Sequence, residues 1–224
     1  MNKTILLASL RAAVLAVPEI LPLLSPSARA ALKASGDYTS IRAEMSGEIH
    51  DAVYDYLTGS GNITTYRAAM ALAISQAYVE TADAAYQEGG GELPLDDDTA
   101  AWARAELDAQ LAYVDQLFEN LRELRKEGDV NAAAEALARA NGYASSLDQL
   151  YSEALTRGAK NKMLTFVGSD GKESCKDCKR MKGERHRASW WIEHDMVPGS
   201  SAYECGGWNC EHYLEDDNGE RFTI

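Results

Sequence analysis

Four cysteines near the end of this 224-residue chain are the residues whose type and spacing most directly indicate chemistry. Cys175 and Cys178 form a Cys-x2-Cys pair, and Cys205 and Cys210 form a Cys-x4-Cys pair after 26 intervening residues. Two close thiolate pairs joined by a longer connection are typical of a tetrahedral zinc site, because each pair binds one side of the ion. The spacing therefore predicts a structural Zn2+ site with these four cysteines as ligands.

Two histidines are alternative ligands, because a Cys3His set also holds zinc stably. His212, two residues after Cys210, is better placed than His186. Two other uses of the cysteines remain open, namely disulfides formed outside the cell and a redox or catalytic role. A thioredoxin-like motif is disfavoured, because no βαβ pattern surrounds the Cys-x2-Cys pair.

Charge is distributed unevenly around the cysteines. The chain carries a net charge of -13, which disfavours nonspecific DNA binding by the whole surface. From Arg157 to Arg187, however, ten Lys or Arg residues stand against four Asp or Glu residues. This basic segment either balances an anionic zinc-thiolate site or contacts DNA. The candidate phosphate contacts are Lys176, Lys179, Arg180, Lys182, Arg185 and Arg187.

One enzymatic interpretation rests on the segment between the cysteine pairs. His194-Asp195-Met196-Val197-Pro198 is faintly similar to the active strand of His-Asn-His nucleases that carry zinc-binding cysteine pairs. The dipeptide order is inverted, and only fourteen residues follow Cys210, which leaves little room for a final metal-binding helix. No Gly-x-Ser-x-Gly, phosphate loop or His-Glu-x2-His motif occurs. We therefore expect a non-enzymatic protein and keep an HNH-like nuclease as the less favoured alternative.

The residues before about Met163 have helical periodicity, so a mainly α-helical body must position the cysteines. In one helix the apolar residues Leu107, Leu111, Val114, Phe118 and Leu121 share a face. Its start is predicted at the acidic cap Asp96-Asp97-Asp98-Thr99 and its end at Gly128. The other helices are predicted at residues 39–57, with Asn62 capping the next at 63–87, and at 130–140 and 144–162.

The N-terminal segment Ile5 to Leu24 is apolar but interrupted by Arg11 and Glu19 and divided by two prolines. It is similar to a secretory signal, with Ala28-Arg29-Ala30 as a candidate cleavage site. The interruptions favour an amphipathic docking helix or a buried helix, and no stable membrane insertion is expected. We expect the protein to be cytosolic when made, where paired cysteines favour metal over disulfides.

The C-terminal part has a different composition, rich in glycine and aromatic residues. Short strands are predicted at residues 164–167 and 221–224, in a loop-rich module with too little apolar mass to fold well alone. Bound metal would supply the missing stabilisation. The predicted domains are a multi-helix body of residues 1–163, with a subdivision near 88–96, and a zinc-binding module of residues 164–224.

Taken together, these residues resemble the phage minor head protein, or head-morphogenesis, family of the Mu type. The stronger part of the resemblance runs from Leu150 to Leu214, through both cysteine pairs, His186-Arg-Ala-Ser-Trp190 and Pro198-Gly199. The weaker part is helical and runs from Tyr56 to Met70. Members of the family often carry a third cysteine where this chain has His212, and the resemblance therefore implies that His212 is a candidate ligand, with the choice of ligand set left open.

The resemblance implies a virion component present in few copies near the portal and the inner capsid. The expected partners are the portal or major capsid protein, packaged DNA, and other copies of the chain. The protein would be in the host cytoplasm during assembly and in the phage head afterwards. The alternative from a different class is a zinc-dependent DNA-binding protein free in the host cytosol.

Overall fold

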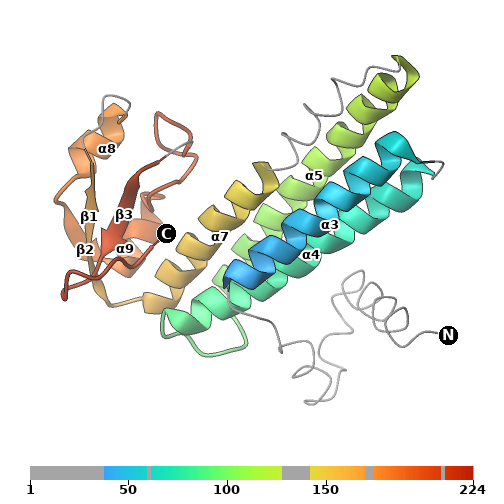
Figure 1. The fold of residues 1–224 in the computed structure, drawn as a ribbon. Coiled ribbons are helices and arrows are strands. Elements are labelled where there is room, and N and C mark those ends of the chain that lie inside the picture. Colours follow the sequence, from blue (N-terminus) through green and yellow to red (C-terminus); the bar gives the residue numbers. More distant parts are fainter. Residues whose placement is uncertain (1–37, 60–61, 128–141, 170–173, 208–209, 224) are drawn as a thin grey trace. The chain divides into compact units, whose positions relative to one another are not determined.

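A computed structural model describes residues 38–59, 62–127, 142–169, 174–207 and 210–223 (Figure 1). The protein is mainly α-helical with one small antiparallel sheet, as predicted. The expected helices at Ile5–Leu24 and 130–140 lie outside the described residues. No helix in the described ranges is long and apolar enough to cross a membrane.

The described residues form two compact units. Of these residues, the first unit contains those up to Glu80 and those between Leu107 and Ala144, and the second contains Thr81–Glu106 and those from Ser145 onward. The second unit therefore combines the cysteine module with residues 145–159, which form most of the last body helix, and with one end of each of the two preceding helices. Neither limit coincides with the predicted boundary at 163/164. That boundary stays a prediction.

In the first unit, α3 (Tyr38–Thr58) lies against α4 (Ile63–Glu88) and α5 (Asp97–Glu127) (Figure 1). The buried side chains of α3 follow helical spacing, which gives the helix one apolar face. Tyr56 from this face packs edge-on against Tyr66 and Phe118, with ring centroids 6.1 and 5.7 Å apart. These contacts join all three helices around one core.

The predicted helix caps are confirmed. The Thr64 N–H donates to Asn62 Oδ1 at 3.0 Å at the start of α4. The Thr99 N–H donates to Asp96 Oδ1 at 2.9 Å at the start of α5. Each carboxylate or amide oxygen satisfies a backbone N–H that has no partner within the helix.

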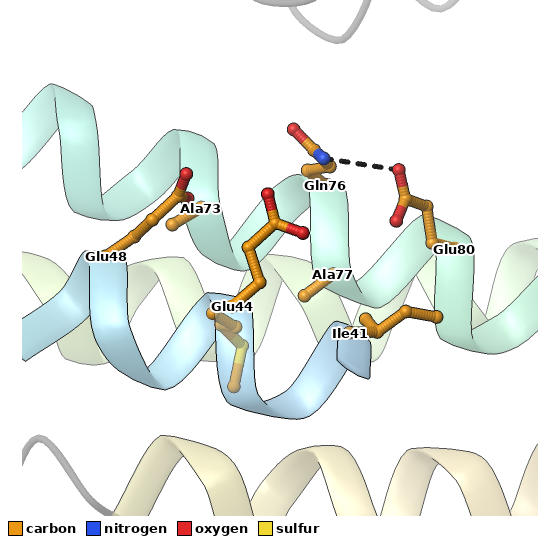
Figure 2. A pocket seen from close by; sticks show the side chains of 8 residues that line it. Ile41, Glu44, Glu48, Ala73, Gln76, Ala77 and Glu80 are labelled. Atoms are coloured by element: carbon orange, nitrogen blue, oxygen red, sulfur yellow. Dashed lines mark hydrogen bonds between the residues drawn. The ribbon is translucent and has the colours of Figure 1, made fainter. Parts of the chain in front are cut away.

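Figure 2 shows a groove between α3 and α4 in the first unit. Its rim is acidic, with Glu44, Glu48 and Glu80, and Gln76 donates a hydrogen bond to Glu80 at 3.2 Å. Ala73 and Ala77 contribute only small side chains to it. The chemistry is that of a solvated helix face.

In the second unit, α7 (Gly142–Ala159) crosses the end of α4 at very close range. A Cβ on Gly158 would lie 2.1 Å from the Tyr86 carbonyl oxygen, and one on Gly89 would lie 2.1 Å from the Leu155 carbonyl oxygen. Beside the crossing, Tyr151 donates from its hydroxyl to Glu88 at 2.7 Å. The two backbones can approach this closely only because both positions are glycine.

The cysteine module follows α7 and is built on a three-stranded antiparallel sheet of order β2-β1-β3. The central strand β1 (Met163–Gly168) pairs with β2 (Arg185–Arg187) and with β3 (His212–Glu215). Two short helices, α8 (Lys176–Met181) and α9 (Ala188–Glu193), complete it. The strand predicted at 164–167 is confirmed. The strand predicted at 221–224 is reduced to one isolated bridge, between Arg221 and Glu215.

The module also has an apolar core, and the expectation that it folds poorly alone stays a prediction. Leu164 and Phe166 of β1 are fully buried on one face of the sheet, with Leu214 of β3 and Trp191 of α9. The Trp191 indole N–H donates to the Leu164 carbonyl oxygen at 3.3 Å, so its one polar group is satisfied. Cys178 belongs to this same core, which ties the candidate metal ligands to the packing.

We predict that Gly158→Ala destabilises the protein by about 1–3 kcal/mol, because the added methyl group overlaps a backbone oxygen that no rotamer change can move. The measurement is urea denaturation followed by circular dichroism.

Gly47→Ala is the matched control, since Gly47 is an exposed residue of α3 with nothing within 4 Å of an added Cβ. This variant should gain about 0.5–1 kcal/mol from helix propensity. Equal effects at the two glycines would contradict the close crossing of α4 and α7.

Candidate metal centre

The first cysteine pair is positioned by the start of α8. Cys175 is the N-cap residue, and its thiol accepts the Cys178 backbone N–H at 3.4 Å. The Lys179 N–H donates to the Cys175 carbonyl oxygen at 3.1 Å, which closes the first helical turn. The three-residue spacing therefore brings both sulfur atoms to one end of a short helix.

The second pair lies on the connection between α9 and β3. Cys205 is in a tight turn in which the Gly206 N–H donates to the Tyr203 carbonyl oxygen at 2.7 Å. Gly207 has a φ of +78°, and a Cβ there would lie 2.0 Å from the Gly199 carbonyl oxygen. A glycine is therefore required where these two loops meet. Cys210 follows and leads into β3.

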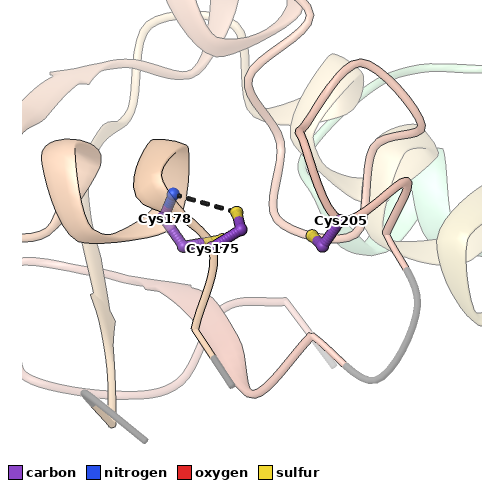
Figure 3. Close-up of side chains that lie close together, drawn as sticks. All are labelled: Cys175, Cys178 and Cys205. Atoms are coloured by element: carbon purple, nitrogen blue, oxygen red, sulfur yellow. Dashed lines mark hydrogen bonds between the residues drawn. The ribbon is translucent and has the colours of Figure 1, made fainter. Parts of the chain in front are cut away.

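The four cysteines and His212 form a candidate metal-binding site. Their donor atoms fall into two triplets, each with all members within 4.8 Å of one another: Cys175, Cys178 and Cys205, and Cys178, Cys210 and His212. Figure 3 shows Cys175 and Cys178 at the start of α8 and Cys205 on the loop opposite them. Cys178 is common to both triplets.

The distances between donor atoms suit a tetrahedral ion. With metal–sulfur bonds of about 2.3 Å, neighbouring sulfur atoms of a tetrahedral site lie about 3.8 Å apart. The Cys178 and Cys210 sulfur atoms are 4.0 Å apart. Cys210 Sγ lies 3.9 Å from His212 Nδ1. Small adjustments would bring these donors into contact with one ion.

His212 is held rigidly, because it is a buried residue of β3 packed against β1. It pairs with Gly168 in the sheet, and its ring lies 5.3 Å from the Phe166 ring. A Cβ on Gly168 would lie 2.7 Å from His212 Cδ2. The missing side chain of Gly168 therefore makes room for the imidazole.

His186, the other predicted alternative ligand, belongs to neither triplet. Its ring stacks on Trp190 with centroids 3.7 Å apart, and its Nε2 lies 3.3 Å from Glu184. Of the two histidines, the structure brings only His212 to the cysteines.

Two acidic residues that the sequence analysis did not single out join the cysteine pairs to each other. The Glu204 N–H donates to Asp177 Oδ2 at 3.0 Å, and the Lys176 N–H donates to Glu204 Oε2 at 3.1 Å. The two bonds form a reciprocal clasp between the start of α8 and the Cys205 loop. Their positions in the sequence could have pointed to this role, because Asp177 lies inside the first cysteine pair and Glu204 directly precedes Cys205.

The thiols strongly influence one another's ionisation. Burial raises the pKa of Cys178 far above its ordinary value, and its neighbours Cys175, Cys210 and Cys205 raise it further. Burial also raises the pKa of Cys205, although the Gly207 N–H opposes the rise. Burial disfavours the Cys175 thiolate as well, but hydrogen bonds from Cys178 and Cys205 keep its pKa below the ordinary value. Neighbouring thiolates therefore repel, and a bound cation would reverse this effect.

Three of the six candidate DNA contacts are ion-paired within the module: Lys176 with Glu204, Arg180 with Asp177, and Arg185 with Asp217. Arg187 donates to the Asn161 side chain at 3.2 Å. These contacts are solvent-exposed and individually weak, but they give much of the basic segment local acidic partners. Balancing of the zinc-thiolate charge and contact with DNA both stay predictions.

The segment that is faintly nuclease-like forms a turn and no strand. His194 is the C-cap of α9, and its Nδ1 lies 2.9 Å from the Trp190 carbonyl oxygen. Asp195 has a φ of +53° and accepts a hydrogen bond from the Ser200 hydroxyl at 2.8 Å. The strand that such a nuclease needs is therefore absent at this position.

Asp195 instead belongs to a carboxylate-rich contact inside the second unit. Burial raises the pKa of Glu106 on α5, and the charge of Asp195 raises it further. Burial also raises the pKa of Glu153 on α7, although Arg157 opposes the rise with an ion pair of 2.7 Å. Glu106 and Glu153 thus both interact with the Arg157 guanidinium group, and the charge of Asp195 acts on both of these carboxyl groups.

No protein-family model matches the chain. No curated protein sequence matches it significantly, and no solved structure does so.

We predict that Glu106→Gln stabilises the protein at pH 7 by about 0.2–1 kcal/mol, because it removes one of three neighbouring negative charges. A carboxyl group whose pKa is raised by folding binds its proton more tightly in the folded state. Its contribution to stability is therefore fully present below its unfolded pKa of about 4.5 and is lost as the pH rises through the folded pKa. The advantage of the variant should shrink as the pH falls from 7 towards 4.5.

Melting temperatures measured between pH 4.5 and 8 test this expectation. Glu92→Gln, at an exposed position, removes the same charge and serves as the control. An advantage of Glu106→Gln that is independent of pH would contradict the carboxylate contact.

Proposed function

We propose that the C-terminal module is a structural zinc centre and that the protein is a bacteriophage virion component, a minor head protein that acts at the portal and inner capsid. The zinc centre is supported by the convergence of four cysteine sulfurs and one histidine from separate segments of the module. The assignment as a virion component is supported by the resemblance of the segment Leu150–Leu214 to head-morphogenesis proteins.

Zinc is the metal that best suits this donor set. Sulfur-rich tetrahedral sites select zinc or iron–sulfur clusters, whereas magnesium and calcium require oxygen ligands. A mixed set of thiolates and one imidazole at sulfur–sulfur distances near 4 Å is typical of a mononuclear zinc site. The ion would fix the start of α8 against the Cys205 loop and the start of β3.

A structural role follows from the number of donors. Catalytic zinc keeps one coordination position open for water or substrate, whereas structural zinc has four protein ligands. Four cysteines fill a tetrahedral site, and we assign them no catalytic role. The module then acts as a rigid contact surface for a portal or capsid partner.

We predict one zinc ion per purified chain, with Cys178→Ser as the most damaging single ligand change. Cys178 is common to both triplets and is 2% exposed, so no neighbouring water replaces its sulfur easily. Zinc affinity should fall at least about tenfold, and the melting temperature of the zinc-loaded protein should fall with it.

Zinc content is measured by plasma emission spectrometry, and affinity by competition with a chelating dye. His186→Ala is the control, because His186 belongs to neither triplet. Wild-type protein without a stoichiometric transition metal, even after zinc is supplied during refolding, would refute the zinc centre.

We further predict that the protein co-sediments with purified virions produced from the genome that encodes it. The measurement is quantitative mass spectrometry of particles banded in a density gradient. Its copy number should be far below that of the major capsid protein and constant between preparations. Particles that lack the chain would exclude the virion assignment and would favour a zinc protein free in the host cytosol.

A further inference from the structure

The metal centre offers five protein donors, although a tetrahedral ion needs four. The two triplets overlap only at Cys178. If the other two members of the first triplet were lost as ligands, the second triplet would remain complete. The cluster can therefore hold one ion in two different ways.

The members that belong to the first triplet alone are also those open to solvent. Cys175 and Cys205 are partly exposed, and their sulfur atoms lie within 4.8 Å of each other. In the second triplet, Cys178 and His212 are only 2% and 3% exposed. Cys210 is partly exposed, but both of its partners in that triplet are buried. Cys175 and Cys205 lie close together (Figure 3) and are partly exposed, so an oxidant that arrives from solvent can reach both.

We propose that the centre has two ligand sets. In the reduced protein the four cysteines hold the ion. When Cys175 and Cys205 are joined by a disulfide, Cys178, Cys210 and His212 retain it. The inference rests on the proposed zinc centre and adds a redox response to it.

The oxidation balances with a peroxide as the oxidant. The Cys175 thiolate attacks one peroxide oxygen, the O–O bond breaks, and a sulfenic acid and a hydroxide ion form. The Cys205 thiolate then attacks the sulfenic sulfur, the S–S bond forms, and a second hydroxide ion leaves. The two thiolates lose two electrons, the peroxide gains them, and two protons from solvent convert both hydroxide ions to water.

The geometry permits this step with small movements. A disulfide bond is about 2.05 Å long, so sulfur atoms that begin within 4.8 Å must approach by less than about 3 Å. Cys205 is followed by two glycines in a tight turn, and Cys175 lies outside the helical residues of α8. Cys178 and His212, in contrast, are fixed by the core and by the sheet.

The change of ligands would also change the character of the centre. Four thiolates on Zn2+ carry a net charge of -2, whereas two thiolates and a neutral imidazole leave the centre neutral. Three protein ligands also leave one coordination position for water. Oxidation would thus convert a closed anionic centre into a neutral centre with an open position, without loss of the ion.

The test is oxidation of the zinc-loaded, full-length protein with one equivalent of hydrogen peroxide. We expect two of the four thiols to disappear in a thiol assay, and peptide mapping should find the disulfide between Cys175 and Cys205. After gel filtration, the oxidised protein should still carry about one zinc ion per chain. Co2+ substituted for zinc should show weaker sulfur-to-metal charge-transfer absorption after oxidation, by about half.

His212→Asn is the decisive variant, with His186→Asn as its matched control. The His212 variant should hold zinc while reduced and should lose at least about ten times more zinc than the control when oxidised. The double variant Cys175→Ser, Cys205→Ser provides a second test, since it should bind one zinc ion and retain it in peroxide. Failure of this double variant to bind zinc would overturn the inference.

Other outcomes distinguish a failure of the two ligand sets from a failure of the proposed zinc centre. Reduced wild-type protein that binds no metal would refute the zinc centre and the inference together. If the reduced protein binds zinc but releases it on oxidation, or if the disulfide joins Cys178 to Cys210, the two ligand sets are wrong and the zinc centre stands. If His212→Asn fails to bind zinc while reduced, His212 is a permanent ligand, which also contradicts the exchange.

Discussion

The mutual repulsion of closely spaced, partly buried thiolates is the physical constraint on which the C-terminal module depends. Burial is the main reason that the pKa of Cys178 is raised, and the charges of the neighbouring sulfurs raise it further. A divalent cation between them converts this repulsion into attraction. The sulfur positions are those of a possible metal-binding site.

Contacts within the protein, and not only a bound ion, would hold these ligands in place. The clasp between Asp177 and Glu204 holds the two cysteine loops together through backbone N–H groups. Cys178 belongs to the same apolar core as Phe166 and Trp191, so one ligand is fixed by packing. Ligands that are already in place lose little conformational freedom on binding, which strengthens metal affinity without adding any contact. The ion would then stabilise a module that already has a core.

The long helices could be predicted from the sequence because their signals are local. Apolar periodicity and the caps Asn62 and Asp96 mark their limits to within a few residues. The elements of the cysteine module are too short for periodicity to identify, and β2 contains only Arg, His and Arg. The two cysteine pairs were visible from spacing. The burial of His212 against Gly168 depends on strand pairing across 44 positions of sequence, which no local pattern reports.

The proposed location of the protein bears on the choice between one ligand set and two. A virion component is assembled in a reducing cytoplasm and then persists outside the cell, where thiols oxidise. A centre with only four cysteines would keep just two protein ligands when the other two form a disulfide, and it would then hold its ion weakly. A buried histidine outside the oxidisable pair removes this weakness, because imidazole does not form disulfides and remains a zinc ligand at neutral pH. The placement of His212 in the sheet, away from solvent, is therefore consistent with a module that must keep its shape in both environments.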